Sequence, residues 1–168
     1  MIYICEDLSE SRKERMMLQD KIIKKYKMPL LSIIFNYMNE KATNEVTFNI
    51  VKCIEYIVDD MFSPYIFFHL SRESEEGYNA IFIINRDALE LKKISIEIEE
   101  KHVLGKCIDI DIYDKDLKKI EREVLGYSKR RCYLCNGDMR KCIENKNHNK
   151  REIIKYAYDK YDQYMKSI

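Results

Sequence analysis

The feature that most restricts the fold of this chain is the alternation of side chains from Gly105 to Ile112, which reads G-K-C-I-D-I-D-I. Successive residues of a β-strand point to opposite faces of its sheet, so the pattern predicts a strand that follows a glycine turn. Its three isoleucines share one face, while Asp109 and Asp111 share the other. The chain must therefore build a sheet that buries the isoleucines and leaves two carboxylates side by side on the opposite face.

Asp109 and Asp111 admit two interpretations. Carboxylates so close together repel each other unless a cation lies between them, and hard oxygen ligands of this kind suit Mg²⁺. The simpler interpretation is a half-buried strand with an acidic outer face, because a D-x-D pattern is common by chance. We predict a Mg²⁺ site at Asp109 and Asp111 because the segment that follows adds further chemistry.

Four soft metal ligands lie close together near the C-terminus, with the spacing C-x2-C-x6-C-x5-H: Cys132, Cys135, Cys142 and His148. A Cys3His set is typical of a closed structural zinc site, so we predict a compact zinc knuckle without an open position for chemistry. Two alternatives are surface cysteines beside a solvated histidine and a redox C-x-x-C motif. The redox reading lacks the preceding βαβ context that thioredoxin-like motifs have.

Hydrophobic periodicity and breaker residues predict the order of the remaining elements. Leu91, Ile94 and Ile98 fit a helix, although Ile94, Ile96 and Ile98 also alternate as a strand would. We predict helices at 7–27, 44–61, 87–102 and 150–166, strands at 30–37, 65–70, 78–84 and 108–112, and a turn at 71–77.

This order predicts an α+β fold with a ferredoxin-like split βαβ sheet, a leading helix, and a C-terminal zinc knuckle followed by a helix. The length of 168 residues suits one domain with a sizeable core. We therefore predict a single domain over 1–168, with a leading helix at 1–28, an α+β core at 29–127, and the knuckle and final helix at 128–168.

The overall charge argues against two classes of partner. The formal net charge is only +1, so no basic field favours nucleic acid or a membrane surface. The chain lacks a signal-peptide pattern and any run near the roughly 20 apolar residues of a membrane span. We expect a cytoplasmic protein with reduced cysteines and with neither nucleic acid nor a membrane as its partner.

Basic side chains lie near both the acidic pair and the knuckle in the sequence. Arg12 and Arg15 lie about one turn apart on the first predicted helix, where they form either a solvated face or a phosphate-binding pair. Four more cations surround the D-x-D strand and the knuckle in sequence: Lys106, Arg122, Arg130 and Arg131. Carboxylates that hold Mg²⁺ beside such cations suit phosphoryl or nucleotidyl transfer. Alternatively, Arg130 and Arg131 simply decorate the knuckle.

The order of these motifs resembles the citrate lyase holo-acyl-carrier-protein synthase family, also called apo-citrate lyase phosphoribosyl-dephospho-CoA transferases. The family's R-x-E-R segment and the Gln after it resemble Arg12–Arg15 and Gln19, and its P-L-x-S strand entry resembles Pro29–Ser32. Its H-P-L-G-R-L-x-D-x-D-V core is similar to His102–Ile112. Its R-R-C-x2-C-x6-C-x5-H tail has the same spacing as Arg130–His148.

Three positions depart from the family's pattern. The arginine after the glycine is Lys106 here, which keeps the charge but loses the bidentate fork of a guanidinium. The G-P-x-K loop appears as Met38–Lys41, in which only the lysine remains. The pair of prolines before the double arginine appears as Ser128-Lys129. Both aspartates and the whole Cys/His set are present, so the resemblance implies that the activity is retained.

The resemblance implies a nucleotidyltransferase that uses 2′-(5″-triphosphoribosyl)-3′-dephospho-CoA. A serine of the apo-acyl-carrier (gamma) subunit of citrate lyase attacks the α-phosphorus, and pyrophosphate leaves. On this reading Asp109 and Asp111 hold Mg²⁺, and one of them helps to deprotonate the serine. Lys106 and Arg122 complete the catalytic set. The expected substrate-binding residues are Arg12, Arg15, Lys41, Gly105, Arg130 and Arg131.

Two alternatives are not enzymes. A zinc-knuckle module that binds nucleic acid would use Arg130, Arg131, Arg140 and Lys141, but the acidic pair and the near-neutral charge oppose it. The other alternative is a ferredoxin-like protein-interaction domain with structural zinc only. Release of pyrophosphate that requires both donor and carrier would separate the enzyme from both.

Overall fold

The computed structural model describes residues 10–36 and 44–168. In chain order the elements are helix α1 (Glu10–Tyr26), strand β1 (Leu30–Phe35), helix α2 (Glu45–Phe62), strands β2 (Ile66–Ser74) and β3 (Gly77–Ile84), helix α3 (Ala88–Lys101), strand β4 (Ile108–Tyr113), and helices α4 (Met139–Glu144) and α5 (Lys150–Met165). Short 3₁₀ turns lie at η2 (Ser63–Tyr65), η3 (Gly105–Cys107) and η4 (Arg122–Leu125). The expected helix start at Asp7 and strand end at Tyr37 lie outside the described residues.

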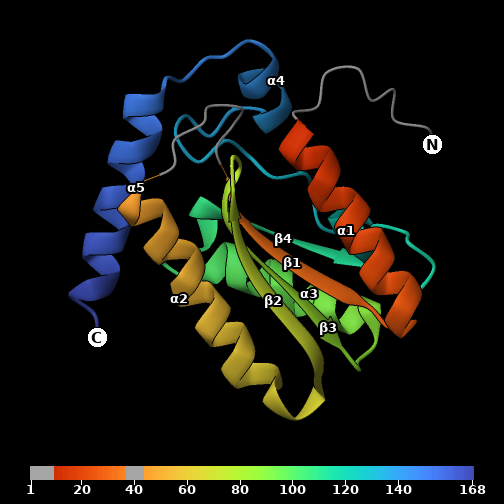
Figure 1. The fold of residues 1–168 in the computed structure, drawn as a ribbon. Coiled ribbons are helices and arrows are strands. Elements are labelled where there is room, and N and C mark those ends of the chain that lie inside the picture. The colour runs from red at the N-terminus through yellow and green to blue at the C-terminus, as the bar shows by residue number, and fades with distance from the viewer. Residues whose placement is uncertain (1–9, 37–43) are drawn as a thin grey trace.

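The four strands form one antiparallel sheet in the order β2-β3-β1-β4 (Figure 1). Strands β1 and β2 therefore run in the same direction with β3 between them, and helix α2 connects them. Strands β3 and β4 likewise run in the same direction with β1 between them, and helix α3 connects them. The prediction of a mixed α and β fold with four strands is confirmed.

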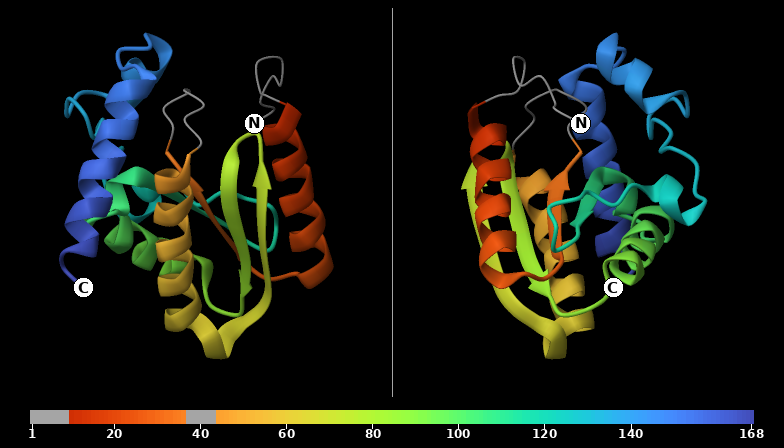
Figure 2. Two further views of the ribbon diagram at one scale, coloured as in Figure 1. Left: turned by 60° about the vertical axis from the view of Figure 1, so that its left-hand side comes forward. Right: turned by 90° about the vertical axis from the view of Figure 1, so that its right-hand side faces the viewer.

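The larger core lies between the sheet and helices α2 and α3. The isoleucines of the D-x-D strand are fully buried in it, beside Ile33 of β1, Phe82 of β3 and Ile54 of α2. Helix α5 packs against α2 on the side away from the sheet (Figure 2). Burying these side chains fixes the register of β4, because a shift by one residue would turn every isoleucine to the other face.

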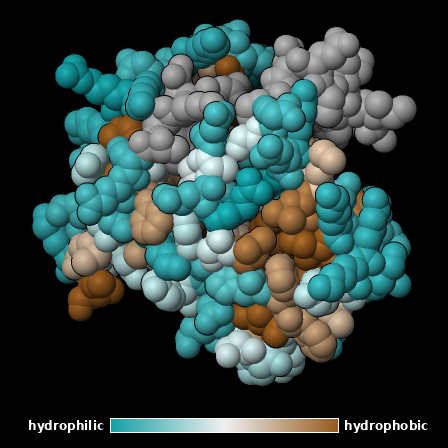
Figure 3. Space-filling model, viewed as in Figure 1, coloured by the Kyte–Doolittle hydropathy of each residue, from teal (hydrophilic) through white to brown (hydrophobic). Residues whose placement is uncertain are grey.

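Helix α1 covers the opposite face of the sheet (Figure 2). Ile22 and Ile23 of α1 form a second, smaller core with Leu30, Ile81 and Ile83 of the sheet. Phe68 and Leu70 of β2 are partly buried and pack against this second core. A hydrophobic patch is visible beside α1 in Figure 3. The acidic pair, Asp109 and Asp111, lies on this α1 face because it alternates with the buried isoleucines.

The predicted extent of the β2–β3 hairpin is wrong. Strand β2 continues to Ser74, through most of the segment that the sequence predicts as a turn, and Ser71 pairs with Ala80. Polar residues are tolerated there because β2 is an edge strand and the Ser71 hydroxyl donates to Glu55 of α2. Only two residues separate the strands, and Gly77, with a φ of 90°, begins β3.

The ambiguous segment after β3 is a helix, as predicted. The Asp87 carboxylate caps α3 by accepting hydrogen bonds from the Leu89 and Glu90 N–H groups at 3.0 Å each. The predicted C-terminal helix is confirmed as α5, whereas the short helix α4 inside the knuckle was not predicted. In the described part of the chain no helix combines the length and apolar character needed to cross a membrane.

Candidate active site on the α1 face of strand β4

Asp109 and Asp111 lie side by side on β4, opposite Ile34 and Ser32 of β1. Their side chains are 39% and 25% exposed, so both are accessible from outside. Each carboxylate has a cation as its partner: Arg130 for Asp109, and Lys119, at 2.8 Å, for Asp111. The sequence therefore placed the acidic pair correctly on one face of a strand, next to basic side chains.

The surroundings give the two carboxylates different pKa shifts. Burial raises the pKa of Asp109, and the nearby charge of Asp111 adds to this against the opposing effect of Arg130. For Asp111 burial acts in the same direction, but Lys119, Lys92 and Arg15 together outweigh it, and the pKa is lowered. Asn36 also donates to Asp109, at 3.1 Å.

Helix α1 brings polar side chains of the R-x-E-R segment to this face. Arg15 is buried and forms an ion pair with Glu76 at 2.8 Å, and the charge of Asp111 helps to raise its pKa against desolvation. Gln19 donates a hydrogen bond of 2.8 Å to the Ser32 hydroxyl, directly beside Asp111 in the sheet. Arg12, by contrast, is exposed.

Arg130 and Arg122 converge on Glu99, a carboxylate of α3 that is only 4% exposed. Both guanidinium groups lie 3.5 Å from Glu99, which also accepts the Ile110 N–H at 2.9 Å. Arg130 further donates to the Ile108 carbonyl at 2.8 Å. These contacts use the backbone groups at the outer edge of β4, which no other strand of the described residues covers, and they hold Arg130 against Asp109.

A separate cavity of about 390 Å³ lies between η4, η3 and the start of the knuckle. We call it the cationic cavity, because Lys106, Arg122, Lys129 and Arg131 line it together with Glu100. Glu100 pairs with Lys106, and with Arg122 at 3.0 Å. The predicted site residues thus form two groups: Arg15 and Arg130 surround the acidic pair, whereas Lys106, Arg122 and Arg131 line this cavity.

The remaining two residues predicted to bind substrate are Lys41 and Gly105. Lys41 lies outside the described residues. Gly105 has a packing role: a Cβ atom there would lie 2.2 Å from the Ile98 carbonyl oxygen and 2.7 Å from that of Glu99. Only glycine therefore allows η3 to pass so closely under the end of α3.

The Cys3His set comes together as predicted. The ligand atoms of Cys132, Cys135, Cys142 and His148 all lie within 4.8 Å of one another. The Cys135 and Cys142 sulfurs are 3.5 Å apart, near the separation of about 3.8 Å that two ligands at 2.3 Å have on a tetrahedral zinc ion. A hydrogen bond from the Gly137 N–H is the largest of several that lower the pKa of Cys135 to about 7. This donor set fits a metal such as zinc.

Hydrogen bonds through Asn36 connect the knuckle to the acidic pair. The Tyr133 hydroxyl donates to the Asn36 carbonyl at 2.9 Å, and the Asn36 amide donates to Asp109. Sequence reasoning missed Asn36, Glu99, Lys119 and Tyr133. No local pattern marks them, because each acquires its role from a tertiary contact.

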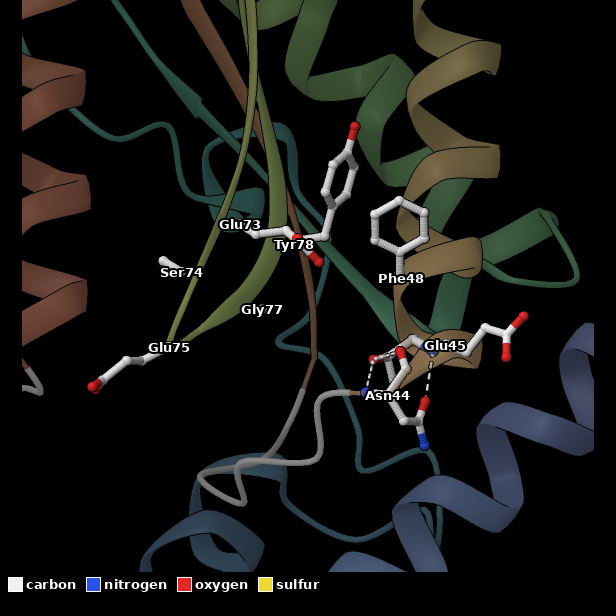
Figure 4. A pocket seen from close by; sticks show the side chains of 9 residues that line it. Asn44, Glu45, Phe48, Glu73, Ser74, Glu75, Gly77 and Tyr78 are labelled. Atoms are coloured by element: carbon white, nitrogen blue, oxygen red, sulfur yellow. Dashed lines mark hydrogen bonds between the residues drawn. The ribbon is translucent and has the colours of Figure 1, made fainter.

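A second pocket, of about 500 Å³, lies between the start of α2 and the β2–β3 hairpin (Figure 4). Phe48 and Tyr78 lie against each other there, with ring centroids 4.6 Å apart. Glu45, Glu73 and Glu75 also line it. Although it is larger than the cationic cavity, its described lining residues include three carboxylates and no cation, which does not suit a phosphate-bearing substrate.

Comparison with known proteins identifies the family to which this chain is similar. The family described as apo-citrate lyase phosphoribosyl-dephospho-CoA transferase, CitX, matches residues 4–164. A protein of Streptococcus pyogenes named probable apo-citrate lyase phosphoribosyl-dephospho-CoA transferase is 28% identical over 88% of this chain and 79% of its own length. A protein of the same name from Vibrio cholerae is 25% identical over 85% of this chain and 83% of its own length.

Longer relatives also match. The protein CitXG of Haemophilus influenzae is 27% identical over 89% of this chain, and the match spans 33% of CitXG. CitXG of Leuconostoc mesenteroides is 39% identical over 43% of this chain and 16% of its own length. The chain therefore spans a third or less of these two relatives. Because the family match covers nearly the whole sequence, this chain belongs to the CitX family of apo-citrate lyase phosphoribosyl-dephospho-CoA transferases.

Proposed function

We propose that this chain attaches a phosphoribosyl-dephospho-CoA group to a serine of the acyl-carrier (gamma) subunit of citrate lyase. The donor is the corresponding triphosphate, and pyrophosphate is the second product. The observation that carries the proposal is the acidic pair: two accessible carboxylates project from one strand face with Arg15, Lys119 and Arg130 around them. The family membership supplies the substrate class.

Asp109 and Asp111 would hold Mg²⁺, which when bound supplies positive charge at the donor's phosphate oxygens. The carboxylates fit this role because the Oδ2 atom of each makes no hydrogen bond to another described residue, while Oδ1 contacts a cation. One oxygen per carboxylate is thus available, and hard oxygen ligands are those that Mg²⁺ prefers.

The chain's own residues would perform the transfer as follows. The serine hydroxyl oxygen forms a bond to the α-phosphorus, the bond from that phosphorus to the bridging oxygen breaks, and pyrophosphate leaves with the electron pair. One carboxylate of the acidic pair accepts the hydroxyl proton. Lys119 and Arg130 stabilise the charge that develops on the phosphate oxygens, with Arg15 in a supporting position. Arg12 and Lys41 remain candidates for binding the donor.

The knuckle would hold zinc through all four ligands and leave no position for substrate, so its role is structural. The strand order and the two helices on one face support a ferredoxin-like sheet. Neither non-enzymatic alternative is favoured. Arg130, on which a nucleic-acid module would depend, is held by Asp109 and Glu99. We further propose a cytoplasmic location, as the carrier partner implies.

Mass spectrometry of the carrier subunit tests the function. The apo carrier is incubated with this chain, the triphosphate donor and Mg²⁺, and we expect its mass to rise by that of the prosthetic group. Reactions without Mg²⁺, and with a carrier whose acceptor serine is replaced by alanine, are the controls. An unchanged carrier mass in the complete reaction, with folded protein and verified donor, would refute the proposal.

A further inference from the structure

The cationic cavity is positively charged beyond what its own carboxylate neutralises. Four cations line it, Lys106, Arg122, Lys129 and Arg131, against one lining carboxylate, Glu100. Hydrogen bonds from Lys106 and Arg122 keep the pKa of Glu100 low against the effect of burial, so it stays ionised. The lining residues therefore have a net charge of about +3, although Arg122 also lies 3.5 Å from Glu99, and this charge favours a polyanionic ligand.

Two of the four cations are available to such a ligand. Arg131 donates to the Asn136 carbonyl at 3.3 Å, which leaves most of its guanidinium donors free. Within 10–36 and 44–168, neither Lys129 nor Arg131 has a carboxylate within ion-pair distance, and both are exposed. Lys106 and Arg122, held by Glu100, form the fixed wall of the cavity.

The cavity is adjacent to the acidic pair but separate from it. The Arg130 guanidinium lies between the two: it contacts Asp109 on one side and the carbonyls of Gly105 and Lys106, at 3.4 Å each, on the other. A ligand that spans both places must therefore carry two separated anionic groups. Dephospho-CoA contains a diphosphate bridge between its adenosine and its pantetheine arm, away from the phosphates that react.

We propose that the cationic cavity binds the diphosphate bridge of the dephospho-CoA part of the donor, while the acidic pair handles the triphosphate. This inference rests on the proposed function for the identity of the donor. The cavity volume of about 390 Å³ lies within the range of roughly 300–1,000 Å³ usual for ligand sites. Tyr127, which is 38% exposed, also lines it and offers an aromatic face to the adenine.

Binding of dephospho-CoA itself, measured by titration calorimetry without donor or carrier, tests the proposal independently of transfer. We expect the double variant Lys129→Gln/Arg131→Gln to weaken binding by about tenfold or more, because two charge-assisted contacts are lost. Glu100→Gln should strengthen binding by about threefold or more, since the competing carboxylate is removed. A variant that merely misfolds cannot produce such a gain.

Matched controls identify which part of the ligand is bound. Arg140→Gln removes an arginine of the knuckle that is 81% exposed and outside the cavity, and it should bind dephospho-CoA like the unmodified chain. Adenosine should bind at least about tenfold more weakly than dephospho-CoA. Inorganic pyrophosphate should compete with dephospho-CoA for the cavity. The Asp111→Asn variant should bind dephospho-CoA with the same affinity as the unmodified chain. If inorganic triphosphate binding is lost in the double variant while dephospho-CoA binding is retained, the cavity serves the reacting phosphates and the inference is overturned.

The two proposals fail in different ways. If the carrier is modified but the double variant binds dephospho-CoA normally, the cavity assignment is wrong and the function stands. If the carrier is never modified but dephospho-CoA binding still depends on Lys129 and Arg131, the function is wrong and the cavity assignment stands.

Discussion

Asp109 and Asp111 show how neighbours decide the roles of two identical side chains. They lie two residues apart on one strand, yet Arg130 and Asn36 hold the first while Lys119 holds the second. Both side chains are partly exposed and lie on the sheet face opposite the isoleucines, so neither is needed to fill the larger core. Their cost to the fold is offset by these cations, and the Oδ2 atom of each makes no hydrogen bond to another described residue. This combination is expected of residues retained for binding rather than for packing.

Replacing Asp111 by Asn should lower the rate of carrier modification by about 10²-fold or more, because one of the two proposed ligands for Mg²⁺ is lost. The fold should persist, since the side chain is 25% exposed. Carrier mass after timed reactions gives the rate, and circular dichroism checks the fold. Asp116→Asn, on an exposed residue of the following loop, is the control. Full activity of Asp111→Asn would remove this residue from the mechanism.

Gly105→Ala should destabilise the chain by about 2–3 kcal/mol, because the new methyl group meets the Ile98 carbonyl oxygen at 2.2 Å and backbone must move. Gly126→Ala is the matched control. A Cβ there meets nothing within 4 Å, and only its φ of 80° opposes the change, at a cost of about 1 kcal/mol. Urea unfolding measures the stability of both variants. If both lose the same unfolding free energy, close packing at Gly105 is not the reason that glycine is required there.

At the scale of elements, alternation and capping residues made the framework predictable. The register of β4 follows from its isoleucines, and α3 follows from Asp87 and the helical stripe that ends before Gly105. The extent of β2 was not predictable in this way, since Ser71 looks like a turn residue until Glu55, which accepts a hydrogen bond from its hydroxyl, is placed beside it. Glu99 and Lys119 were missed for the same reason: their partners are set by tertiary contacts.

Glu55 joins α2 to both strands of the hairpin and should make stability depend on pH. It is 2% exposed and accepts hydrogen bonds from His69 at 2.8 Å, Tyr78 at 2.6 Å and Ser71. Burial opposes ionisation, but the hydrogen bonds from Ser71 and Tyr78, together with Lys52, lower the pKa of Glu55. A lowered folded-state pKa stabilises the fold above the unfolded-state pKa, and this contribution disappears as the pH falls through the folded-state value.

Glu55→Gln should therefore cost about 2 kcal/mol of unfolding free energy near pH 7, and the difference from the unmodified chain should shrink as the pH falls below the ordinary glutamate pKa of about 4.3. Denaturant unfolding at several pH values measures both quantities. Asp60→Asn, on an exposed position of the same helix, should cost little at any pH. A difference for Glu55→Gln that stays constant with pH would mean that the charge of Glu55 is not responsible.

On the scale of the whole molecule, the knuckle completes the site from a distance in sequence. Arg130 reaches Asp109 from the segment just before Cys132, and Tyr133 reaches Asn36 at the end of β1. Helix α5 then packs on α2 behind the sheet. The C-terminal part thus acts on the acidic pair through two side chains, although its metal ligands lie elsewhere. The sequence predicted each part but not this connection, since the residues that make it are 97 positions apart for Tyr133 and Asn36.

These contacts predict that the knuckle and the sheet unfold as one unit. In a guanidinium titration of zinc-loaded protein, zinc release, followed with a chromogenic chelator, and loss of far-ultraviolet dichroism should share one midpoint. Tyr133→Phe removes the hydrogen bond to Asn36 and should lower stability by about 1 kcal/mol and slow carrier modification. Tyr158→Phe is the control, because that side chain is 53% exposed. Two results would contradict this prediction: zinc release at a clearly lower denaturant concentration than the loss of dichroism, and carrier modification that Tyr133→Phe leaves unchanged. Together they would mean that the knuckle is an independent module and that the sheet alone organises the acidic pair.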